Sequence, residues 1–350
     1  MVDEKSLLVD ETPISVGITF AFRANSVVLS MTRLVITLFI VSPLLSAAQL
    51  KLPALNNPPS AVAMLGEGTL STTINERDFA LSPDGTEIFY TISTPRSTFQ
   101  TIVYSKKTSK GEWSLPEVAS FAGEYSDLEP VFSHDGNTLY FSSNRPLTGS
   151  EAKDFDMWKV IRTSGGWSKP ENLGPIVNTE ADEFYPSVAR NGNLYFTAAY
   201  KGGPGREDIY VSEFKSNQYQ KPIALDTMVN SKLYEFNAFV DPDEQYILFT
   251  SYGRKDDSGG GDLYMATKDA AGKWKPAQNL KELNSKQIDY CPFVSPDGKT
   301  LFFTSERHQL PVSFNSGKAT FQKVKDISNS PLNGTGNIYW ISFESLKARL

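Results

Sequence analysis

The chain contains very little cysteine and histidine and has no excess of basic residues. Among its 350 residues are one cysteine, Cys291, and two histidines. A single cysteine excludes an intrachain disulfide framework and a zinc site built from cysteines, and two histidines argue against a histidine-rich metal site. The formal net charge is −6. We therefore expect no nucleic acid partner, because no surplus of lysine and arginine is available to neutralise phosphates.

Glycine, proline and aromatic residues are the residue types that the chain does have in quantity. It contains 24 glycines and 21 prolines, and 12% of its residues are aromatic. Turn formers combined with aromatic residues favour a turn-rich β protein. The hydrophobic fraction of 40% is enough to fill a core and excludes wholesale disorder.

Residues 31–49 follow the order of a secretory signal. Arg33 precedes an apolar run from Leu34 to Val41, and three small residues end at Ala48. The run is shorter than the ~20 residues that span a bilayer. We predict a signal peptide at 31–48 and a periplasmic or secreted protein with no transmembrane span in the mature chain. A single N-terminal membrane anchor is the alternative.

The methionine that would start this signal, Met31, lies inside the chain. We expect residues 1–30 to be a mis-called start or a non-native extension, with a genuine extension as the alternative. Residues 49–350 are then predicted to form a single domain.

One unit recurs five times along this domain. Each copy has a four-residue turn between two short apolar runs, which predicts a β-hairpin. The turns begin at Ser82, Ser133, Ala189, Asp241 and Ser295. A third apolar run follows in each unit, and then a segment with an aromatic residue and a proline. These pairs are Trp113 and Pro116, Trp167 and Pro170, Tyr219 and Pro222, and Trp274 and Pro276.

The order of these segments predicts the architecture. Proline cannot donate to a sheet ladder, so we expect the fourth strand, opening at the aromatic residue, to be outermost. Four antiparallel strands in about 50 residues form the unit of a β-propeller. The fifth unit stops after its third strand at 337–341, while an unassigned apolar segment at 59–65 precedes the first unit.

We therefore predict an all-β, five-bladed β-propeller whose N-terminal strand closes the last blade. The blades are expected to start near 76, 127, 183, 235 and 289. Closure leaves no open sheet edge between the first and last blades, so we expect a monomer.

The repeats resemble the WD40-like, TolB-type propeller repeats called PD40. The resemblance is carried by the turn SPDG at 82–85, the segment SSNRP at 142–146, the third strand DIYVS at 208–212 and the outer segment WSKPENL at 167–173. It covers roughly residues 60–345, and the final unit resembles that of secreted bacterial members. The chain lacks the N-terminal α/β domain of TolB, so the resemblance implies the fold and not TolB's role, since propellers carry many activities.

Every unit carries one acid and one base at equivalent positions. The acids, six residues before each turn, are Glu76, Asp127, Glu183, Glu235 and Asp289; the bases, after each second strand, are Arg96, Arg145, Lys201, Arg254 and Arg307. Both sets are predicted on one face of the ring. They form either a binding site at the channel mouth, for a cation, a sugar or a peptide terminus, or a structural ring of turn caps and ion pairs. Repetition in every unit favours the structural interpretation.

The positions that differ between units are more informative about function. Two residues after the acids, and predicted on the same side of the strand, stand Asp78, Glu129, Tyr185, Asn237 and Cys291. Such a mixed set suits a ligand-selective channel lining. We expect no cofactor, with one alternative: Glu76, Asp78, Asp127 and Glu129 could hold a divalent cation through oxygen ligands. The other interpretation of these four is a solvated acidic rim.

The fifth unit differs by a long segment, 306–336, which contains His308. Long loops inside compact domains are usually functional or disordered. We expect this loop on the face with the charges, as a lid, as a partner-docking loop, or as a plug over the channel.

These observations predict a non-enzymatic binding scaffold that recruits a protein or peptide of the cell envelope at the channel mouth. The alternative is a carbohydrate-binding or glycoside-hydrolysing propeller that uses inner-strand carboxylates, with Glu76, Asp127 and Glu183 as candidates. No motif of such hydrolases is recognisable, so no catalytic residue is assigned. Carboxylates held by arginines or turn amides would favour the scaffold, and unpaired carboxylates in an open pocket would favour hydrolysis.

Overall fold

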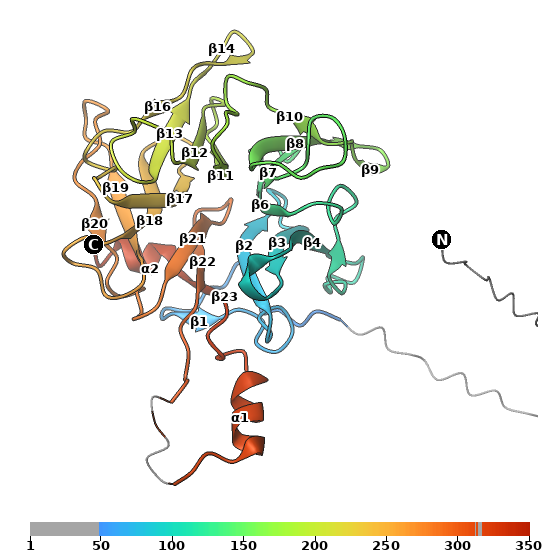
Figure 1. The fold of residues 1–350 in the computed structure, drawn as a ribbon. Coiled ribbons are helices and arrows are strands. Elements are labelled where there is room, and N and C mark those ends of the chain that lie inside the picture. The colour runs from blue at the N-terminus through green and yellow to red at the C-terminus, as the bar shows by residue number, and fades with distance from the viewer. Residues whose placement is uncertain (1–48, 312, 314–316) are drawn as a thin grey trace, which may run out of the picture. The chain divides into compact units, whose positions relative to one another are not determined.

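The described part of the chain folds into five antiparallel blade sheets around a central axis and one additional two-stranded ribbon (Figure 1). The computed structural model describes residues 49–311, 313 and 317–350. The predicted signal peptide, its cleavage site and the extension before it lie outside the described residues. The arrangement confirms the predicted five-bladed β-propeller of four-stranded blades.

Each blade runs from an inner strand at the axis to a short outer strand. Blade 1 contains β2 (Asn75–Leu81), β3 (Glu87–Ser93), β4 (Gln100–Lys106) and β5 (Glu117–Val118), with a 3-10 turn at Pro95–Ser97. Blade 2 contains β6 (Asp127–Phe132), β7 (Thr138–Ser143), β8 (Asp156–Thr163) and β10 (Glu171–Asn172), with β9 (Gly166–Trp167) paired to β8. Blade 3 contains β11 (Glu183–Val188), β12 (Leu194–Ala198), β13 (Asp208–Ser212) and β16 (Ile223–Ala224), and carries the ribbon β14 (Phe214–Lys215) and β15 (Gln218–Tyr219). Blade 4 contains β17 (Tyr234–Val240), β18 (Tyr246–Tyr252), β19 (Asp262–Thr267) and β20 (Gln278–Asn279).

Blade 5 joins the two ends of the described chain. It contains β21 (Asp289–Val294), β22 (Thr300–Ser305), β23 (Asn337–Ser342) and, as its outer strand, β1 (Ala63–Met64). Ala63 pairs with Trp340 and Met64 with Tyr339, and the Leu65 amide donates to the carbonyl oxygen of Ile338 at 2.8 Å. The predicted closure of the ring by an N-terminal strand is confirmed.

The outer strands are shorter than predicted. They begin after the proline, while the aromatic residue before it belongs to a separate turn. This residue pairs with the end of the third strand in blade 2 and with the segment just after the third strand in blades 1, 3 and 4. Trp113, for example, pairs with Lys107, whose ammonium lies 5.0 Å from the indole ring centroid. Proline removes a backbone donor, so the ladder is interrupted there and only two residues beyond it pair with the blade.

Every inner strand carries a β-bulge that redirects the residues after its acid. The register shifts lie between Arg77 and Ala80 in blade 1 and at the equivalent place in the other four blades. The second residue after each acid takes a positive φ of 50–62°; these residues are Asp78, Glu129, Tyr185, Asn237 and Cys291. A left-handed backbone at a non-glycine residue is unfavourable and persists only where the surroundings impose it. A bulge of this kind bends the strand and increases its local twist.

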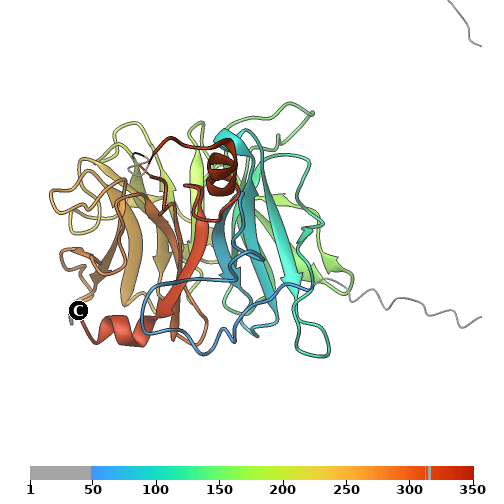
Figure 2. The ribbon, with the colours of Figure 1, turned by 90° about the horizontal axis from the view of Figure 1, so that it is seen from below.

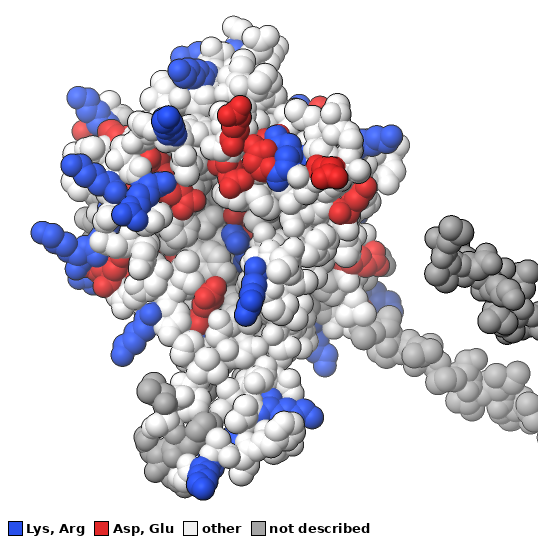
Figure 3. All heavy atoms as spheres, viewed as in Figure 1, with Lys and Arg blue, Asp and Glu red and all other residues white. Residues whose placement is uncertain are grey.

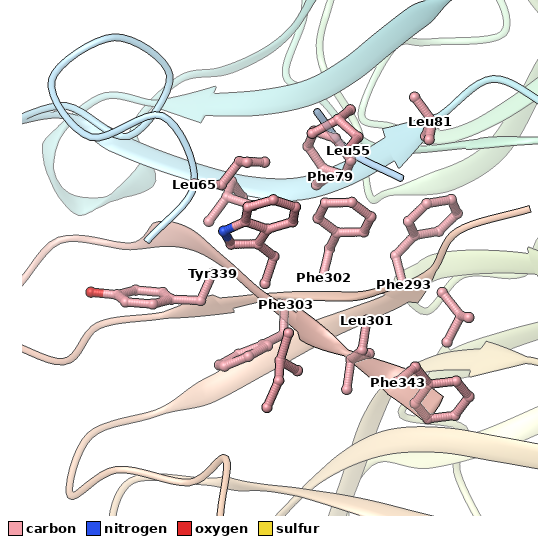
Figure 4. Packing of buried hydrophobic residues seen from close by; sticks show 14 of the residues in the cluster. Leu55, Leu65, Phe79, Leu81, Phe293, Leu301, Phe302, Phe303, Tyr339 and Phe343 are labelled. Carbon is pink, nitrogen blue, oxygen red and sulfur yellow. The ribbon is translucent and has the colours of Figure 1, made fainter. Parts of the chain in front are cut away.

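The largest apolar cluster among the described residues extends from blade 4 through blade 5 to blade 1. Figure 4 shows Phe79 of β2 against Phe302 of β22, with Leu55 and Leu65 of the N-terminal segment packed on the same side. The rings of Phe79 and Phe302 are stacked, with centroids 4.4 Å apart. The closing segment is therefore part of the core and not only an extra edge strand.

The described residues form two short α-helices. α2 (Phe343–Lys347) follows β23 and buries Phe343 and Leu346. α1 (Phe321–Ser328) lies in the long loop of blade 5, begins at the cap residue Thr320, and buries none of its residues. No helix among the described residues is long and apolar enough to cross a membrane.

Candidate functional site

The five repeated acids cap the turns that precede their own strands. Each acid is buried, and its carboxylate accepts a hydrogen bond from the backbone amide four residues earlier. The amides are those of Thr72 for Glu76 (3.0 Å), Gly123 for Asp127 (3.1 Å), Thr179 for Glu183 (3.1 Å), Ser231 for Glu235 (2.7 Å) and Ser285 for Asp289 (2.5 Å). These turn caps match the structural interpretation of the ring.

Arginines complete the ring in three of the five blades. Arg145 pairs with Asp127, Arg254 with Glu235 at 2.9 Å, and Arg307 with Asp289 at 2.8 Å. Each guanidinium also donates to a carbonyl oxygen of the preceding turn and lies over aromatic rings of its blade; those rings are Phe141 and Trp158, Phe249 and Tyr264, and Phe303 and Tyr339.

The expected base is not paired with the acid in the other two blades. Arg96 and Lys201 are exposed, and neither forms an ion pair within the described part of the chain. Arg96 stands in the 3-10 turn after β3, with a φ of 62°. The ion pairing of the structural interpretation thus does not hold in blades 1 and 3. There Thr72 donates a side-chain hydrogen bond to Glu76, and Thr179 and Tyr200 donate to Glu183.

The unpaired acids lead to a pH prediction. Burial raises the pKa of Glu76 and of Glu183 to about 7, from 4.5. Between these values the folded chain binds protons that the unfolded chain does not, so its stability decreases as the pH rises from 4.5 to 7. We expect E183Q to remove up to about 3 kcal/mol of the stability lost by the wild type between pH 5 and pH 8. Denaturant unfolding at both pH values measures this, with E180Q at an exposed neighbour as control. Equal pH dependence in wild type and E183Q would contradict it.

The bulge residues form a second ring, separate from the acids. Because the bulge breaks the alternation of side chains along the strand, the predicted common lining of both sets is wrong: the acids face their own turns and the bulge residues face one another. Glu129 accepts hydrogen bonds from the Tyr185 amide at 2.6 Å and from the Asn237 side chain at 3.3 Å. Burial raises the pKa of Glu129 to about 7, and Arg77 opposes the rise.

Threonines of the second strands hold most of these bulges. Thr304, Thr91 and Thr197 accept from the bulge amides of Asp78, Glu129 and Asn237 at 3.3, 3.0 and 3.0 Å. The equivalent residue of β7 is Ser142, which instead donates to Glu129 at 3.2 Å, and Glu129 takes over as the acceptor for the next blade. Glu129 is thus bound into the scaffold and is not a free group of the channel.

Arg77 lies between the acidic bulge residues of the first two blades, Asp78 and Glu129. Its guanidinium donates to Asp78 and to Glu129, both at 2.8 Å, and lies 5.2 Å from the centroid of the Tyr290 ring. A cation bound between these two acids would have to displace the guanidinium. Among the described residues, no three acidic, histidine or cysteine side chains are placed so that they could hold one metal ion.

The channel opens above Arg77 into a pocket of about 370 Å³ that all five blades line. We call it the channel-mouth pocket. Its charged residues are Arg77, Glu129, Glu207 and Glu306; its apolar and aromatic residues are Leu128, Phe155, Phe184, Phe236, Ile288 and Tyr290; its polar residues are Asn75, Ser97, Gln100, Thr197 and Asn237. Figure 3 views this face, with acidic and basic side chains around the central hollow.

The pocket shares only two residues, Glu129 and Asn237, with the predicted binding set. Asp78 and Tyr185 line a small cavity beneath it, and Cys291 is buried beside them. The sequence does carry a signal for the missed residues. The position directly after each acid holds Arg77, Leu128, Phe184, Phe236 and Tyr290, a set that breaks the repeat and lines the pocket in every blade.

Two further carboxylates of the pocket form no ion pair among the described residues, although Tyr290 donates a hydrogen bond to one of them, Glu306. Glu207 precedes β13 and Glu306 follows β22, both are half-buried, and neither forms an ion pair with any described residue. Burial raises the pKa of Glu207 to about 7, and the nearby acids Asp182 and Asp208 add to the rise. Burial also raises the pKa of Glu306, against the influence of Arg77.

The long loop of blade 5 does not close the channel with the helix that it carries. Figures 1 and 2 show α1 beside the ring and away from its axis, so a plug formed by this helix is ruled out. His308 is hydrogen-bonded to the Gln287 side chain at 2.7 Å and through Nδ1 to the Leu310 amide at 3.2 Å. It therefore holds the base of the loop.

No protein-family model matches the chain, and no curated protein matches it. Similar solved structures include TolB from Acinetobacter baumannii (14% identity, TM-score 0.43, 66% of this chain and 49% of that one) and the endo-arabinase from Bacteroides thetaiotaomicron (13%, 0.45, 75% and 100%). Hydrazine synthase of Kuenenia stuttgartiensis is another (13%, 0.47, 77% and 40%). The chain thus spans about half the length of TolB. At these identities the likeness concerns the fold alone.

Proposed function

We propose that the protein is a non-enzymatic binding propeller of the periplasm or extracellular space, which recruits a protein or peptide partner at the channel mouth. One observation carries the proposal: all five repeated acids are engaged in turn caps, whereas the channel-mouth pocket has an irregular lining of half-buried aromatic side chains and unpaired carboxylates. Concave sites with aromatic walls and a few convergent polar groups are typical of binding sites.

The alternative, a glycoside-hydrolysing propeller, has less support. Its candidate carboxylates, Glu76, Asp127 and Glu183, are buried and accept hydrogen bonds from turn amides. A general acid and its partner carboxylate must instead flank a substrate across an open site. By the same argument we assign a structural role to the other ring residues, which are Glu235, Asp289, Arg254 and Arg307.

The pocket walls can be tested directly. We expect the double variant F184S/F236S to weaken binding of peptides selected on the wild-type chain by at least about tenfold, because interface aromatics at the centre of a pocket contribute most of the binding energy. Fluorescence anisotropy with labelled peptides measures the affinity, and circular dichroism verifies the fold.

The matched control removes two apolar side chains that are exposed elsewhere. Leu147 and Ile223 are 63% and 62% exposed and line no part of the pocket. L147S/I223S should leave binding unchanged. If both double variants bind alike, the site lies elsewhere on the propeller and the proposal fails.

A further inference from the structure

We propose that the channel-mouth pocket receives the cationic head of a lysine or arginine side chain that the peptide partner presents. The inference rests on the proposed function, because it specifies which residue of the partner enters the site. It follows from the charges, the walls and the size of the pocket.

The only basic residue that lines the pocket is not available to an anion. Arg77 is held by Asp78 and Glu129 at 2.8 Å each, stacks on Tyr290, and leaves 16% of its side chain exposed. A carboxylate or phosphate from a partner would have to break these two ion pairs, and breaking a partly buried pair is strongly unfavourable. The positive charge at the floor of the pocket is therefore already neutralised from within the fold.

The carboxylates above this floor are not ion-paired within the described part of the chain, and only Glu306 accepts a side-chain hydrogen bond, from Tyr290. Glu207 comes from blade 3 and Glu306 from blade 5, so they approach the pocket from different blades. Both are half-buried without an ion pair among the described residues. Partial burial of a carboxylate without a counter-charge is unfavourable, and a cation bound in the pocket that both line would offset that penalty.

Three phenylalanines form a wall that suits the rest of a long basic side chain. Phe155 and Phe184 are in contact, with ring centroids 5.0 Å apart, and Phe236 follows at the equivalent position of the next blade. All three are half-buried. Methylene groups of lysine or arginine pack on such rings, and the charged head is attracted to their faces.

The volume sets the scale of what enters. About 370 Å³ is at the lower end of the range for ligand pockets, which suits one extended side chain and excludes a helix or a folded loop. The remainder of the peptide would then lie across the mouth of the channel.

The test uses dodecapeptides selected from a random display library on the purified wild-type chain. The strongest binder is resynthesised with its basic residue intact, or with norleucine in its place. We expect the norleucine peptide to bind at least about tenfold more weakly, and the intact peptide to lose a similar factor on E207Q/E306Q. The two Glu→Gln substitutions keep the size of the side chains. If the double variant does not fold, the single variant E207Q is measured in its place.

Matched controls separate this effect from the general charge of the face. Glu124 and Glu151 are exposed in neighbouring loops and line no part of the pocket. E124Q/E151Q changes the net charge by the same amount, and we expect it to leave the affinity unchanged.

The outcomes distinguish the two proposals. If peptides bind and depend on Phe184 and Phe236 but carry no basic residue, or bind E207Q/E306Q as tightly as wild type, the cationic inference is wrong and the proposed function stands. If no peptide depends on the pocket aromatics, both fail. If oligosaccharides bind there and peptides do not, both fail and the carbohydrate alternative gains support.

Discussion

A chain that starts at Gly66 is expected to lose its folded state, whereas one that starts at Gln49 retains it. The truncation removes β1, the outer strand of blade 5, together with the buried leucines Leu50, Leu55 and Leu65. Loss of one buried leucine side chain typically lowers the free energy of unfolding by about 2–5 kcal/mol. The loss of all three leucines is comparable with the total free energy of unfolding of a domain, which is about 5–15 kcal/mol. Figure 4 shows two of these leucines against Phe79 and Phe302, where the first and last blades meet.

Circular dichroism and gel filtration measure this effect. The truncated chain should lack a cooperative thermal transition and should aggregate through the exposed edge of β23. The point variant L65A tests the same contact more mildly and should lower the free energy of unfolding by about 2–5 kcal/mol. L147A, at a leucine that is 63% exposed, is the control and should change it by less than about 0.5 kcal/mol. A truncated chain that melts like the reference would contradict closure by the N-terminal strand.

Equivalent bases of two blades should respond very differently to the same substitution. R307A is expected to lower the free energy of unfolding by about 3–5 kcal/mol, because it leaves the buried Asp289 carboxylate without its counter-charge. It also removes the hydrogen bond to the Leu283 carbonyl oxygen at 2.7 Å and the stacking on Tyr339 at 4.5 Å. R96A, at the same repeat position of blade 1, should change stability by less than about 0.5 kcal/mol, since Arg96 is exposed.

Urea unfolding of both variants and of the wild type measures the difference. R307K is the informative intermediate, because lysine keeps the charge but cannot donate to Asp289 and to Leu283 in the same fork geometry. Equal destabilisation by R307A and R96A would mean that the charge ring does not hold the blades in the way described above.

The contrast between the two rings has a consequence for function. Side chains that repeat in every blade are expected to stabilise each blade, and the five acids that cap the turns are of this kind. Groups that differ between blades give the channel mouth its asymmetry, which a selective binding site requires. Glu207, Glu306 and the phenylalanines of the pocket belong to this second kind.

Much of the fold could be predicted from the chain because its turns and apolar runs are local signals. The hairpin turns, the strand order and the unpaired third strand at 337–341 follow from residue spacing, and closure by 59–65 follows from the unit that lacks a fourth strand. The helix α1 could not be found in this way, because it is one short segment inside a long loop. Nor could the length of the outer strands, which depends on where the ladder resumes after proline.

The candidate site was predicted less well, and the reason is the bulge. Strict alternation places Asp78, Glu129 and their equivalents on the same side of the strand as the acids. Under that rule the residue directly after each acid, such as Arg77 or Phe184, lies on the opposite side of the strand. Arg77, Phe184 and their equivalents come before the bulge and line the channel mouth, whereas the positive φ redirects the residue that follows each of them. The residue types do not predict the bulge, because aspartate, glutamate, tyrosine, asparagine and cysteine all take the left-handed conformation at this position.

The sequence by itself determined the number of blades, the turns between strands and the position of the acids and bases in each unit, because these depend on residues that are close in the chain. Only the tertiary structure decided which arginines reach their acids, and that Arg77 stands between Asp78 and Glu129. It alone also brought Glu207 and Glu306, which lie in different blades, to one pocket. Contacts between blades depend on how five sheets pack around one axis, and no local pattern encodes that geometry.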